Sequence, residues 1–337
     1  MVGSRIPFKL WDLGTMRYWT KEQIDGIMSA IEEDRLAVFF GSGISVSGGL
    51  PDWDGLRKCL LKTIDNPDLY PKRLKAGIGY VMDRNPEQSL DYLKNLDPQA
   101  FEKQFRKIFS KKREQYQTTK EGLILAKIKS NRFITTNYDY CFQNSFNKVN
   151  QLSRLSEISC REFNGVKLDQ IGSPTIFQIH GSSEMDINEL VLTDSQYETA
   201  YTEGSPIREL LNHLFSEFLV LFVGFGFNDG DITRILKKYN AYSKQRAKYQ
   251  HIGIFGHYGN KSQMIGMTDF ARRHWNTETV FYKINTRNGK STHVGIRKLL
   301  SELYKSIDDR FVDKVMPSTY ISDESQMAIA PLMHVDK

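Results

Sequence analysis

Four short segments of the chain combine residue types that can hold an anion or move a proton. They are Gly-Ser-Gly-Ile-Ser at 41–45, Thr-Thr-Asn-Tyr-Asp at 135–139, His-Gly at 180–181 and Gly-Phe-Gly-Phe-Asn-Asp at 224–229. Each segment directly follows an apolar run of strand length. Glycine-rich turns after strands bring backbone close to phosphates, and histidine is the side chain best suited to proton transfer near neutral pH.

The first segment predicts an anion site. Gly41 and Gly43 let the backbone approach a phosphate, and exposed N–H groups in such a turn form an anion nest. The hydroxyls of Ser42, Ser45 and Ser47 add donors. The spacing is neither the G-x-G-x-x-G of dinucleotide enzymes nor a P-loop. Taken alone, a plain turn between a strand and a helix explains this segment equally well.

The other three segments have equally plain readings when each is taken alone. Asn137 and Asp139 follow a strand, where such residues often only shape a turn. A lone histidine in apolar surroundings, such as His180, is more often a core residue than a catalyst. Asp229 and Asp231 begin the next predicted helix, where they can cap it or bind a ribose hydroxyl.

The elements around these segments predict an α/β fold. Continuous apolar runs are typical of strands buried on both faces of a parallel sheet. They occur at Leu36–Phe40, Arg132–Asn137, Thr175–Gly181, Phe218–Gly226, His251–Gly256 and Thr279–Ile284. Helical patterns separate several of them, notably Ile207–Glu217 and Asp231–Tyr239. Such alternation predicts a doubly wound, mostly parallel, Rossmann-like sheet with its ligand beyond the carboxyl ends of the strands.

The stretch from 54 to 119 departs from this pattern, because it is charged, helix-forming and without a strand-like run. We expect a helical module inserted into one sheet domain that spans residues 1–316, followed by a tail or arm at 317–337. A basic cluster ends the module: Lys103, Arg106, Lys107, Lys111, Lys112 and Arg113. We interpret the cluster as a solvated helix face and do not expect nucleic acid as a partner.

Composition describes an ordinary globular protein of 337 residues with 40% hydrophobic residues and a formal net charge of +6. Its three cysteines, Cys59, Cys141 and Cys160, are too far apart for a zinc ribbon or a disulfide framework, so we expect no metal and a reducing, cytoplasmic location. We expect no signal peptide, because the N-terminus has no long apolar run. The longest apolar run, Phe218–Phe227, is too short to span a bilayer.

Together with Gly-Leu-Pro-Asp-Trp at 49–53, the four segments resemble the sirtuin family. Sirtuin-like proteins carry, in this order, Gly-Ala/Ser-Gly-x-Ser, Gly-Ile/Leu-Pro-x-Trp/Phe, Thr-x-Asn-x-Asp, His-Gly and a Gly-x-Gly/Ser turn. This chain has Gly-Ser-Gly-Ile-Ser at 41–45, Gly-Leu-Pro-Asp-Trp at 49–53, Thr-Thr-Asn-Tyr-Asp at 135–139, His-Gly at 180–181 and Gly-Phe-Gly at 224–226. The resemblance runs from about residue 24 to about residue 303.

The resemblance implies that NAD is the substrate and that its nicotinamide–ribose bond is cleaved. Asn137 would position the attacking water, and His180 would be the general base on a ribose hydroxyl or on that water. The residues implied in NAD binding are Gly41, Ser42, Gly43, Ile44 and Ser45 at the pyrophosphate, Pro51 and Trp53 in a mobile loop over the nicotinamide, Thr136, Asp139 at the nicotinamide ribose, and Gly224, Phe225, Gly226, Asn228 and Asp229 on the adenosine side.

The chain departs from sirtuin deacylases in one respect that changes the expected reaction. Those enzymes hold a zinc ribbon of four cysteines between the Asn and Gly-x-Gly motifs, whereas this chain has only Cys141 and Cys160 there. We therefore expect water as the acceptor, which makes the reaction NAD hydrolysis to nicotinamide and ADP-ribose. The form Phe-Ile-Thr-Thr-Asn-Tyr-Asp at 133–139 and the helical module after Pro51 are similar to those of a bacterial sirtuin-like branch found in antiphage systems. That likeness implies an effector kept inactive by a homo-oligomer, a separate sensor protein or both.

Two other functions stay open on the sequence. One is a non-catalytic subunit that binds NAD or ADP-ribose and scaffolds a complex, although keeping both Asn137 and His180 argues against it. The other is a transferase of ADP-ribosyl or acyl groups whose acceptor comes from another protein.

Overall fold

The computed structural model describes residues 18–243, 250–287 and 290–315. Seven strands form one sheet in the order β3-β4-β2-β1-β5-β6-β7, and every neighbouring pair is parallel. They are β1 (Leu36–Phe40), β2 (Arg132–Thr135), β3 (Ser156–Ser159), β4 (Thr175–Gln178), β5 (Leu219–Val223), β6 (His251–His257) and β7 (Thr277–Lys283). The predicted fold class is confirmed. The predicted tail at 317–337 lies outside the described residues.

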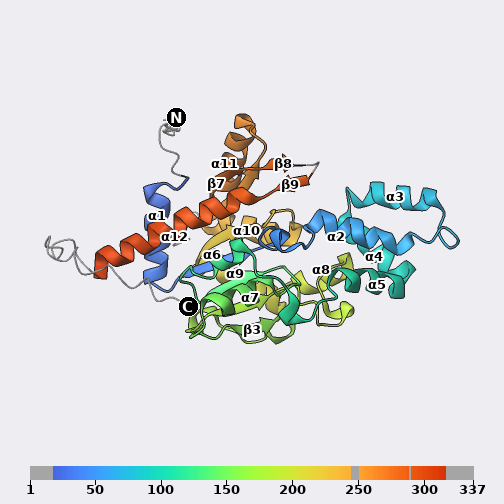
Figure 1. Cartoon of the computed structure of the whole chain (residues 1–337), viewed down its shortest axis with the longest axis horizontal. Coiled ribbons are helices and arrows are strands. Elements are labelled where there is room, and N and C mark those ends of the chain that lie inside the picture. Colours follow the sequence, from blue (N-terminus) through green and yellow to red (C-terminus); the bar gives the residue numbers. More distant parts are fainter. Residues whose placement is uncertain (1–17, 244–249, 288–289, 316–337) are drawn as a thin grey trace, which may run out of the picture.

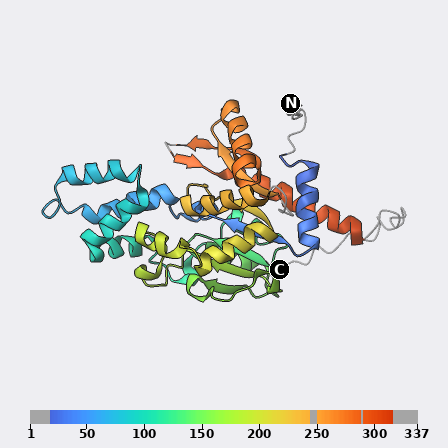
Figure 2. The ribbon, with the colours of Figure 1, turned by 180° about the vertical axis from the view of Figure 1, so that it is seen from behind.

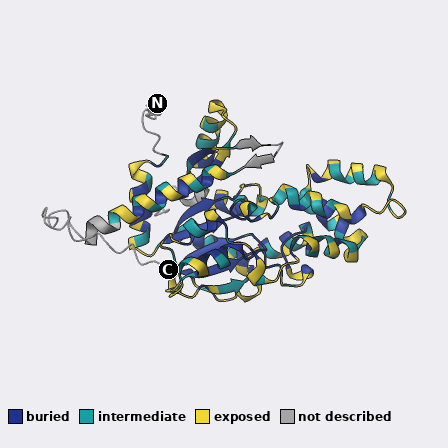
Figure 3. Ribbon diagram, in the orientation of Figure 1, coloured by how far each residue is buried: buried dark blue, intermediate teal, exposed yellow. Residues whose placement is uncertain are grey.

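Helices cover both faces of the sheet, as Figures 1 and 2 show from opposite sides. One apolar core joins alternate strand residues to α1 (Lys21–Glu32), α6 (Lys120–Leu125), α7 (Cys141–Val149) and α12 (Val294–Val315). A second core joins the opposite strand face to α8 (Asp194–Tyr201), α9 (Pro206–Glu217), α10 (Gly230–Ser243) and α11 (Lys261–Trp275). The central strands are accordingly buried along their whole length (Figure 3).

The order of the strands creates a crevice at one point of the sheet. After β1 the chain forms β2, then the edge strand β3, and then β4 between these two, all on one side of β1. It then crosses over to build β5, β6 and β7 on the other side. The carboxyl ends of β1 and β5 are therefore neighbours whose following turns leave the sheet in opposite directions. Such a switch point is where open parallel sheets bind ligands.

Two strand features were missed by the sequence interpretation. The edge strand β3 is half-exposed and has no apolar run. A short antiparallel hairpin, β8 (Asn285–Arg287) with β9 (Lys290–Thr292), stands apart from the main sheet. The six predicted strands all form, but β2 and β4 end before the polar residues Asn137 and His180, which therefore belong to the loops.

Between β1 and β2 the chain forms α2 (Trp53–Leu60), α3 (Lys72–Met82), α4 (Pro86–Leu96) and α5 (Pro98–Ile108). These helices extend beyond the sheet in Figure 1 and share an apolar core of their own. In the predicted basic cluster, Arg106 donates to the carbonyl oxygens of Ser183 and Met185, and Arg113 pairs with Glu157. These two arginines therefore make structural contacts, Arg106 with the chain after His180 and Arg113 with β3. No helix in the described ranges is both long and apolar enough to cross a bilayer.

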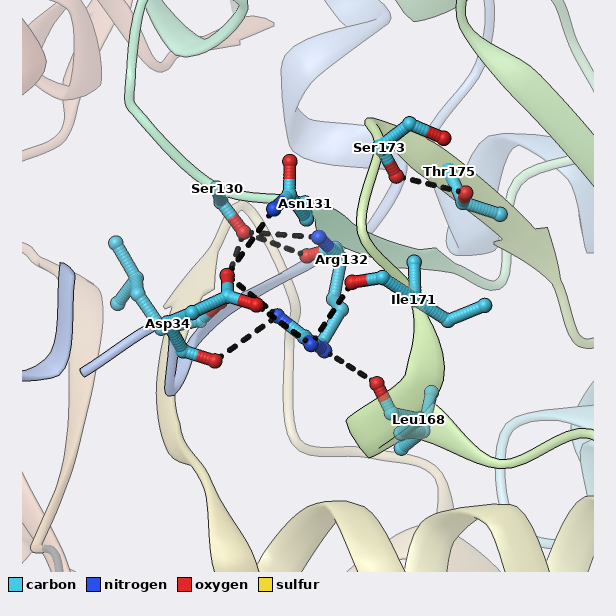
Figure 4. A network of polar contacts seen from close by, with 9 residues as sticks. Asp34, Ser130, Asn131, Arg132, Leu168, Ile171, Ser173 and Thr175 are labelled. Carbon is cyan, nitrogen blue, oxygen red and sulfur yellow. Dashed lines mark hydrogen bonds and ion pairs between the residues drawn. The ribbon is translucent and has the colours of Figure 1, made fainter. Parts of the chain in front are cut away.

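A polar network ties the amino end of β2 to its surroundings (Figure 4). The guanidinium of Arg132 is buried and pairs with the carboxylate of Asp34, with nitrogen–oxygen distances of 2.8 and 3.0 Å. It also donates to the carbonyl oxygens of Leu168 and Ile171. This arginine thus donates to loop carbonyls at the amino ends of the strands, which is the side of the sheet opposite to the switch point.

Candidate active site

A cavity of about 520 Å³ lies beyond the carboxyl ends of β1, β2, β4 and β5. It brings together most residues that the sequence predicts for the site: Gly41, Ser42, Gly43, Pro51, Trp53, Thr136, Asn137, Asp139, His180, Gly224, Phe225, Gly226, Asn228 and Asp229. Ile44 and Ser45 do not line it. Ile44 is fully buried in the core, and Ser45 is 1% exposed behind the cavity wall.

The two glycine turns touch each other across the switch point. Gly41 N–H donates to the carbonyl of Val223 at 3.1 Å, and Gly43 N–H to that of Gly224 at 3.0 Å. A Cβ on Gly43 would lie 2.7 Å from the Gly224 Cα, which no real contact allows. Glycine is therefore required here because two backbones meet, whether or not a phosphate lies against them.

The predicted nest of exposed N–H groups differs from what the structure shows. The N–H groups of Gly41, Gly43, Ile44 and Ser45 all donate to main-chain carbonyls, so these four cannot receive an anion. Within the described ranges, the N–H of Ser42 makes no hydrogen bond, and its residue lines the cavity. Any anion held by this turn would meet Ser42 alone.

Asn137 and Asp139 belong to one buried network centred on Ser45. The Ser45 hydroxyl donates to Asp139 Oδ1 at 3.0 Å and accepts from Asn137 Nδ2 at 3.2 Å. Asn137 Nδ2 also donates to the carbonyl of Gly41 at 3.1 Å. Both amide protons of Asn137 are thereby used, which leaves its Oδ1 as an acceptor. Burial raises the pKa of Asp139, although hydrogen bonds from Cys141 and Ser45 oppose the rise.

His180 lies two residues beyond β4 and is 3% exposed, yet it lines the cavity. Its Nε2 is 2.7 Å from the Tyr201 hydroxyl and 3.6 Å from Asp229 Oδ2. The ring also makes edge contacts with Tyr197 and Tyr201. Burial lowers the pKa of His180 to about 3, so the ring is neutral at physiological pH.

Asp229 lies beside His180. Its Oδ1 caps α10 by accepting from the N–H groups of Asp231 and Ile232, at 3.1 and 2.9 Å. Its Oδ2 is buried and makes no well-formed hydrogen bond, although the Tyr197 hydroxyl is close enough to lower the pKa of this carboxyl group and His180 Nε2 lies 3.6 Å away. Burial raises the pKa of Asp229 to about 7, and the negative charges of Asp231 and Glu87 add to the rise. The assignment of Asp229 to the adenosine side of NAD stays a prediction, and in the structure its carboxyl group faces His180.

Trp53 belongs to a helix in this structure, whereas a loop was expected. It is the first residue of α2, whose N-cap Asp52 accepts from the Gly55 N–H at 2.8 Å. Pro51 precedes this cap, and both Pro51 and Trp53 line the cavity. The wall expected to be a mobile loop is therefore the start of a capped helix.

Several site residues escaped the sequence interpretation. Tyr197 and Tyr201 on α8 surround His180, and Glu87 on α4 lines the cavity. Tyr282 and His293 form part of the wall, joined by a hydrogen bond of 2.7 Å between Tyr282 Oη and His293 Nδ1. The one available signal was the spacing of the two α8 tyrosines, which places them on one helix face. In the described ranges, no group of three or more His, Cys, Asp or Glu side chains could hold a metal ion.

Comparison with known proteins identifies relatives of this chain. Residues 131–279 match the family model described as a SIR2-like domain. The NAD(+) hydrolase ThsA of Acinetobacter baumannii is 24% identical over 70% of this chain and 45% of its own length. The protein of the same name from Cytobacillus dafuensis is 24% identical over 64% of this chain and 40% of its own length. The matches thus span less than half of these relatives.

Among solved structures, the crystal structure of a Sir2 homologue in complex with NAD matches with a TM-score of 0.45 at 12% identity, over 86% of this chain and 94% of that chain. The family match and the sequence relatives lead to one conclusion: residues 131–279 match a SIR2-like domain, and the chain is a distant homologue of the ThsA NAD(+) hydrolases.

Proposed function

We propose that the chain hydrolyses NAD to nicotinamide and ADP-ribose. One observation carries the proposal: a single cavity at the switch point of the sheet contains Asn137, His180 and both glycine turns. The distant homologues, which are named NAD(+) hydrolases, support the same reaction.

NAD would enter with its diphosphate at the two glycine turns. The available donors there are the hydroxyl and N–H of Ser42 and the N–H of Gly226, and none of the three is bonded within the described part of the chain. The nicotinamide end would then point to the loops after β2 and β4, where Asn137 and His180 lie.

Cleavage would break the bond between the nicotinamide nitrogen and ribose C1′. The nicotinamide leaves as a neutral molecule because it takes the bonding electron pair, and the positive charge moves to an oxocarbenium-like ribose. Water adds to C1′ and loses one proton. Asn137 Oδ1 is the acceptor that can orient this water, and His180 is the base that can remove the proton, directly or through a ribose hydroxyl. The carboxyl groups of Asp139 and Asp229 line the same cavity and would favour the positive charge.

The cysteine count supports the proposal that water is the acceptor. Only Cys141 and Cys160 lie between Tyr138 and Leu221, so a four-cysteine zinc ribbon cannot be built there. A hydrolase needs no acyl-lysine channel and no such ribbon.

The proposal extends to biological role through the resemblance. We propose an effector of bacterial antiphage defence that stays inactive until it is triggered, because unregulated NAD hydrolysis would harm the host. As the resemblance implies, control would come from assembly of this chain, from a separate sensor protein, or from both.

The test is nicotinamide release from NAD by the purified chain, followed by chromatography. We expect His180→Gln and Asn137→Ala to reduce release by about 10²- to 10⁴-fold. A matched control is His213→Gln, because His213 lies on α9 outside the cavity. Release only in the presence of an acceptor protein would favour the transferase instead.

If the wild-type chain releases no nicotinamide, binding decides between the remaining functions. Saturable NAD binding without release, with or without candidate partner proteins, would favour a scaffold that only binds the nucleotide. Absence of both binding and release would overturn the proposed function.

A further inference from the structure

The two ring nitrogens of His180 have different surroundings. Nε2 points away from solvent toward the Tyr201 hydroxyl at 2.7 Å and Asp229 Oδ2 at 3.6 Å. Nδ1 has no hydrogen-bond partner in the described part of the chain, although the residue lines the cavity. A neutral imidazole carries its proton on one nitrogen and a lone pair on the other. Which nitrogen holds the proton therefore decides whether the cavity faces a base or a donor.

We propose that Asp229, together with Tyr201, is a positioning residue that keeps the His180 proton on Nε2 and so presents the lone pair of Nδ1 to the substrate. This inference rests on the proposed NAD hydrolysis and adds a residue role that the sequence motifs do not assign. Asp229 would act through His180 and would not itself touch the reacting atoms.

The geometry of Asp229 suits this role. Its Oδ1 is fixed by two N–H groups at the start of α10, so the direction of Oδ2 is fixed as well. Oδ2 is buried without a well-formed hydrogen bond, with the Tyr197 hydroxyl and His180 Nε2 as its polar neighbours, and the whole side chain is 8% exposed. A buried polar atom without a partner is costly, so its presence beside an imidazole calls for a function. At 3.6 Å the contact with Nε2 is electrostatic, while the Tyr201 oxygen accepts the Nε2 proton.

The proton balance is simple. The proton of the attacking water, or of a ribose hydroxyl, moves to Nδ1, while the Nε2 proton stays between the ring, Tyr201 and Asp229. The ring becomes an imidazolium next to a carboxylate, which stabilises the new charge. The same division of roles operates in serine hydrolases, where a buried aspartate orients the histidine and never takes its proton.

The charges around the pair determine its pH dependence. Asp229 is faced by His180, by Tyr138 from the loop after β2, and by Tyr197 and Tyr201 from α8. The carboxylates around it are Asp231 at the start of α10, Glu87 on α4 and, acting on both of these, Asp194 on α8. The cations Arg208 and Arg234 act on Asp231, and Arg57 acts on Glu87.

His180 is neutral near physiological pH, so the carboxyl group of Asp229 should control how activity rises with pH around neutrality. With its pKa raised to about 7, kcat should increase with pH through neutrality as Asp229 ionises. An asparagine at this position has no such titration, so the rise should be absent from Asp229→Asn.

The first experiment reads the tautomer directly and needs no NAD. Ring ¹H–¹⁵N correlation spectra of ¹⁵N-histidine-labelled protein distinguish the two tautomers, and His180→Gln identifies the His180 signals. At pH 8 we expect Nε2–H in the wild type. Asp229→Asn should convert the ring to Nδ1–H, because the asparagine amide donates to Nε2. Asp231→Asn, a matched control two residues away and outside the cavity, should keep Nε2–H.

The second experiment measures nicotinamide release. At pH 8, where Asp229 is ionised with or without the charge of Asp231, Asp229→Asn should lower kcat by about 10²-fold with KM within about threefold of wild type. At the same pH, Asp231→Asn should stay within about threefold of wild type in both quantities. The inference is overturned if the wild-type ring is Nδ1–H, or if Asp229→Asn keeps both the Nε2–H ring and the wild-type kcat. If NAD hydrolysis itself proved wrong, kcat would vanish for every variant while the tautomer result would still stand.

Discussion

At the scale of single residues, the site contains buried polar groups whose hydrogen-bonding capacity is only partly used. Ser45 lies behind the cavity and serves two neighbours at once, because its hydroxyl accepts from Asn137 and donates to Asp139. Such a shared hydroxyl orients the amide of Asn137 so that Oδ1 is left for the substrate. Ser45 is thus a support of the site, although it does not line the cavity.

Replacement of this support should weaken catalysis without unfolding the chain. In Ser45→Ala we expect kcat for NAD to fall by about tenfold, equivalent to one hydrogen bond of about 1.4 kcal/mol. The comparison is Ser29→Ala, which removes an exposed hydroxyl that bonds Glu33. Steady-state kinetics and thermal unfolding of both variants check the expectation. An unchanged kcat in Ser45→Ala would show that Asn137 is held by the Gly41 carbonyl alone.

The carboxyl group of Asp229 should destabilise the fold as pH rises from about 4 to about 7. Its folded pKa of about 7 lies above the ordinary value of 3.8, so the folded state holds a proton that the unfolded state has lost. Stability is therefore lost as pH rises between these two values. Asp229→Asn, which cannot ionise, should gain up to about 4 kcal/mol over wild type at pH 8 and nothing near pH 4.

Urea unfolding from pH 4.5 to 8 measures this difference. Asparagine can still accept the N–H groups of Asp231 and Ile232, so the helix cap is kept. A pH-independent difference between Asp229→Asn and wild type would mean that this carboxyl group titrates normally.

Residue types and strand ends were enough to predict that Asn137, His180 and the glycine turns gather in one place, because parallel strands end at one edge. The partners of His180 Nε2 were not predictable in the same way. Tyr201 lies on α8, and its approach to within 2.7 Å depends on how that helix packs on the sheet. The orphaned Oδ2 of Asp229 depends likewise on burial, which a sequence does not show.

At the scale of elements, the two glycine turns pack so closely that one methyl group should separate them. Gly43→Ala would place its Cβ 2.7 Å from the Cα and 2.9 Å from the carbonyl oxygen of Gly224. We expect a loss of about 2 kcal/mol of stability or more, together with weaker NAD binding. Gly77→Ala on α3 is the control: its Cβ would meet nothing within 4 Å, and stability should rise by about 0.5 to 1 kcal/mol.

Chemical unfolding and NAD titration of both glycine variants give the two quantities. Weak binding by Gly43→Ala at unchanged stability would contradict the packing explanation and restore direct phosphate contact as the reason for this glycine.

The Arg132 network at the opposite edge should matter for stability alone. Arg132→Met would leave the Leu168 and Ile171 carbonyls without their donor and Asp34 without its cation. Because Asp34 is half-exposed, we expect the low end of the range for a broken buried pair, about 3 kcal/mol. Arg273→Met, at an exposed ion pair with Asp269, should change stability by less than about 1 kcal/mol.

Denaturant midpoints of the two arginine variants test this contrast, and KM for NAD in the folded protein should match wild type in both. A raised KM in Arg132→Met would mean that the sheet transmits the change to the switch point, some four residues along β2.

Elements were predictable where burial and pattern agree. The runs Leu36–Phe40 and Leu219–Val223 are buried at every position, and their continuous apolar character follows from helices on both faces. Strand β3, Ser-Glu-Ile-Ser at 156–159, lies at the edge of the sheet, where one partner strand and partial exposure suffice. Its sequence carries no apolar run, so this strand is recognised only from its pairing with β4 in the structure.

At the scale of the whole molecule, the cavity joins two bodies of apolar packing. The core shared by helices α2 to α5 includes Tyr138 and Tyr140, which flank Asp139, and Ile187, Leu190 and Leu192 from the chain after His180. The loops that carry the predicted catalytic residues are therefore packed against these helices on one side and joined to the sheet on the other. The cavity wall accordingly depends on both parts.

Because its wall comes from both parts, binding of NAD should stabilise the molecule as a whole. We expect His180→Gln, which would bind NAD without consuming it, to gain about 2.7 kcal/mol of unfolding free energy at an NAD concentration 100 times Kd. Denaturant unfolding at several NAD concentrations measures the gain, and Gly43→Ala with its disturbed turns should gain less. The chain could instead unfold in two steps, with NAD raising the unfolding free energy of the sheet and leaving that of α2 to α5 unchanged. In that case α2 to α5 contribute no binding energy and serve only to cover the site.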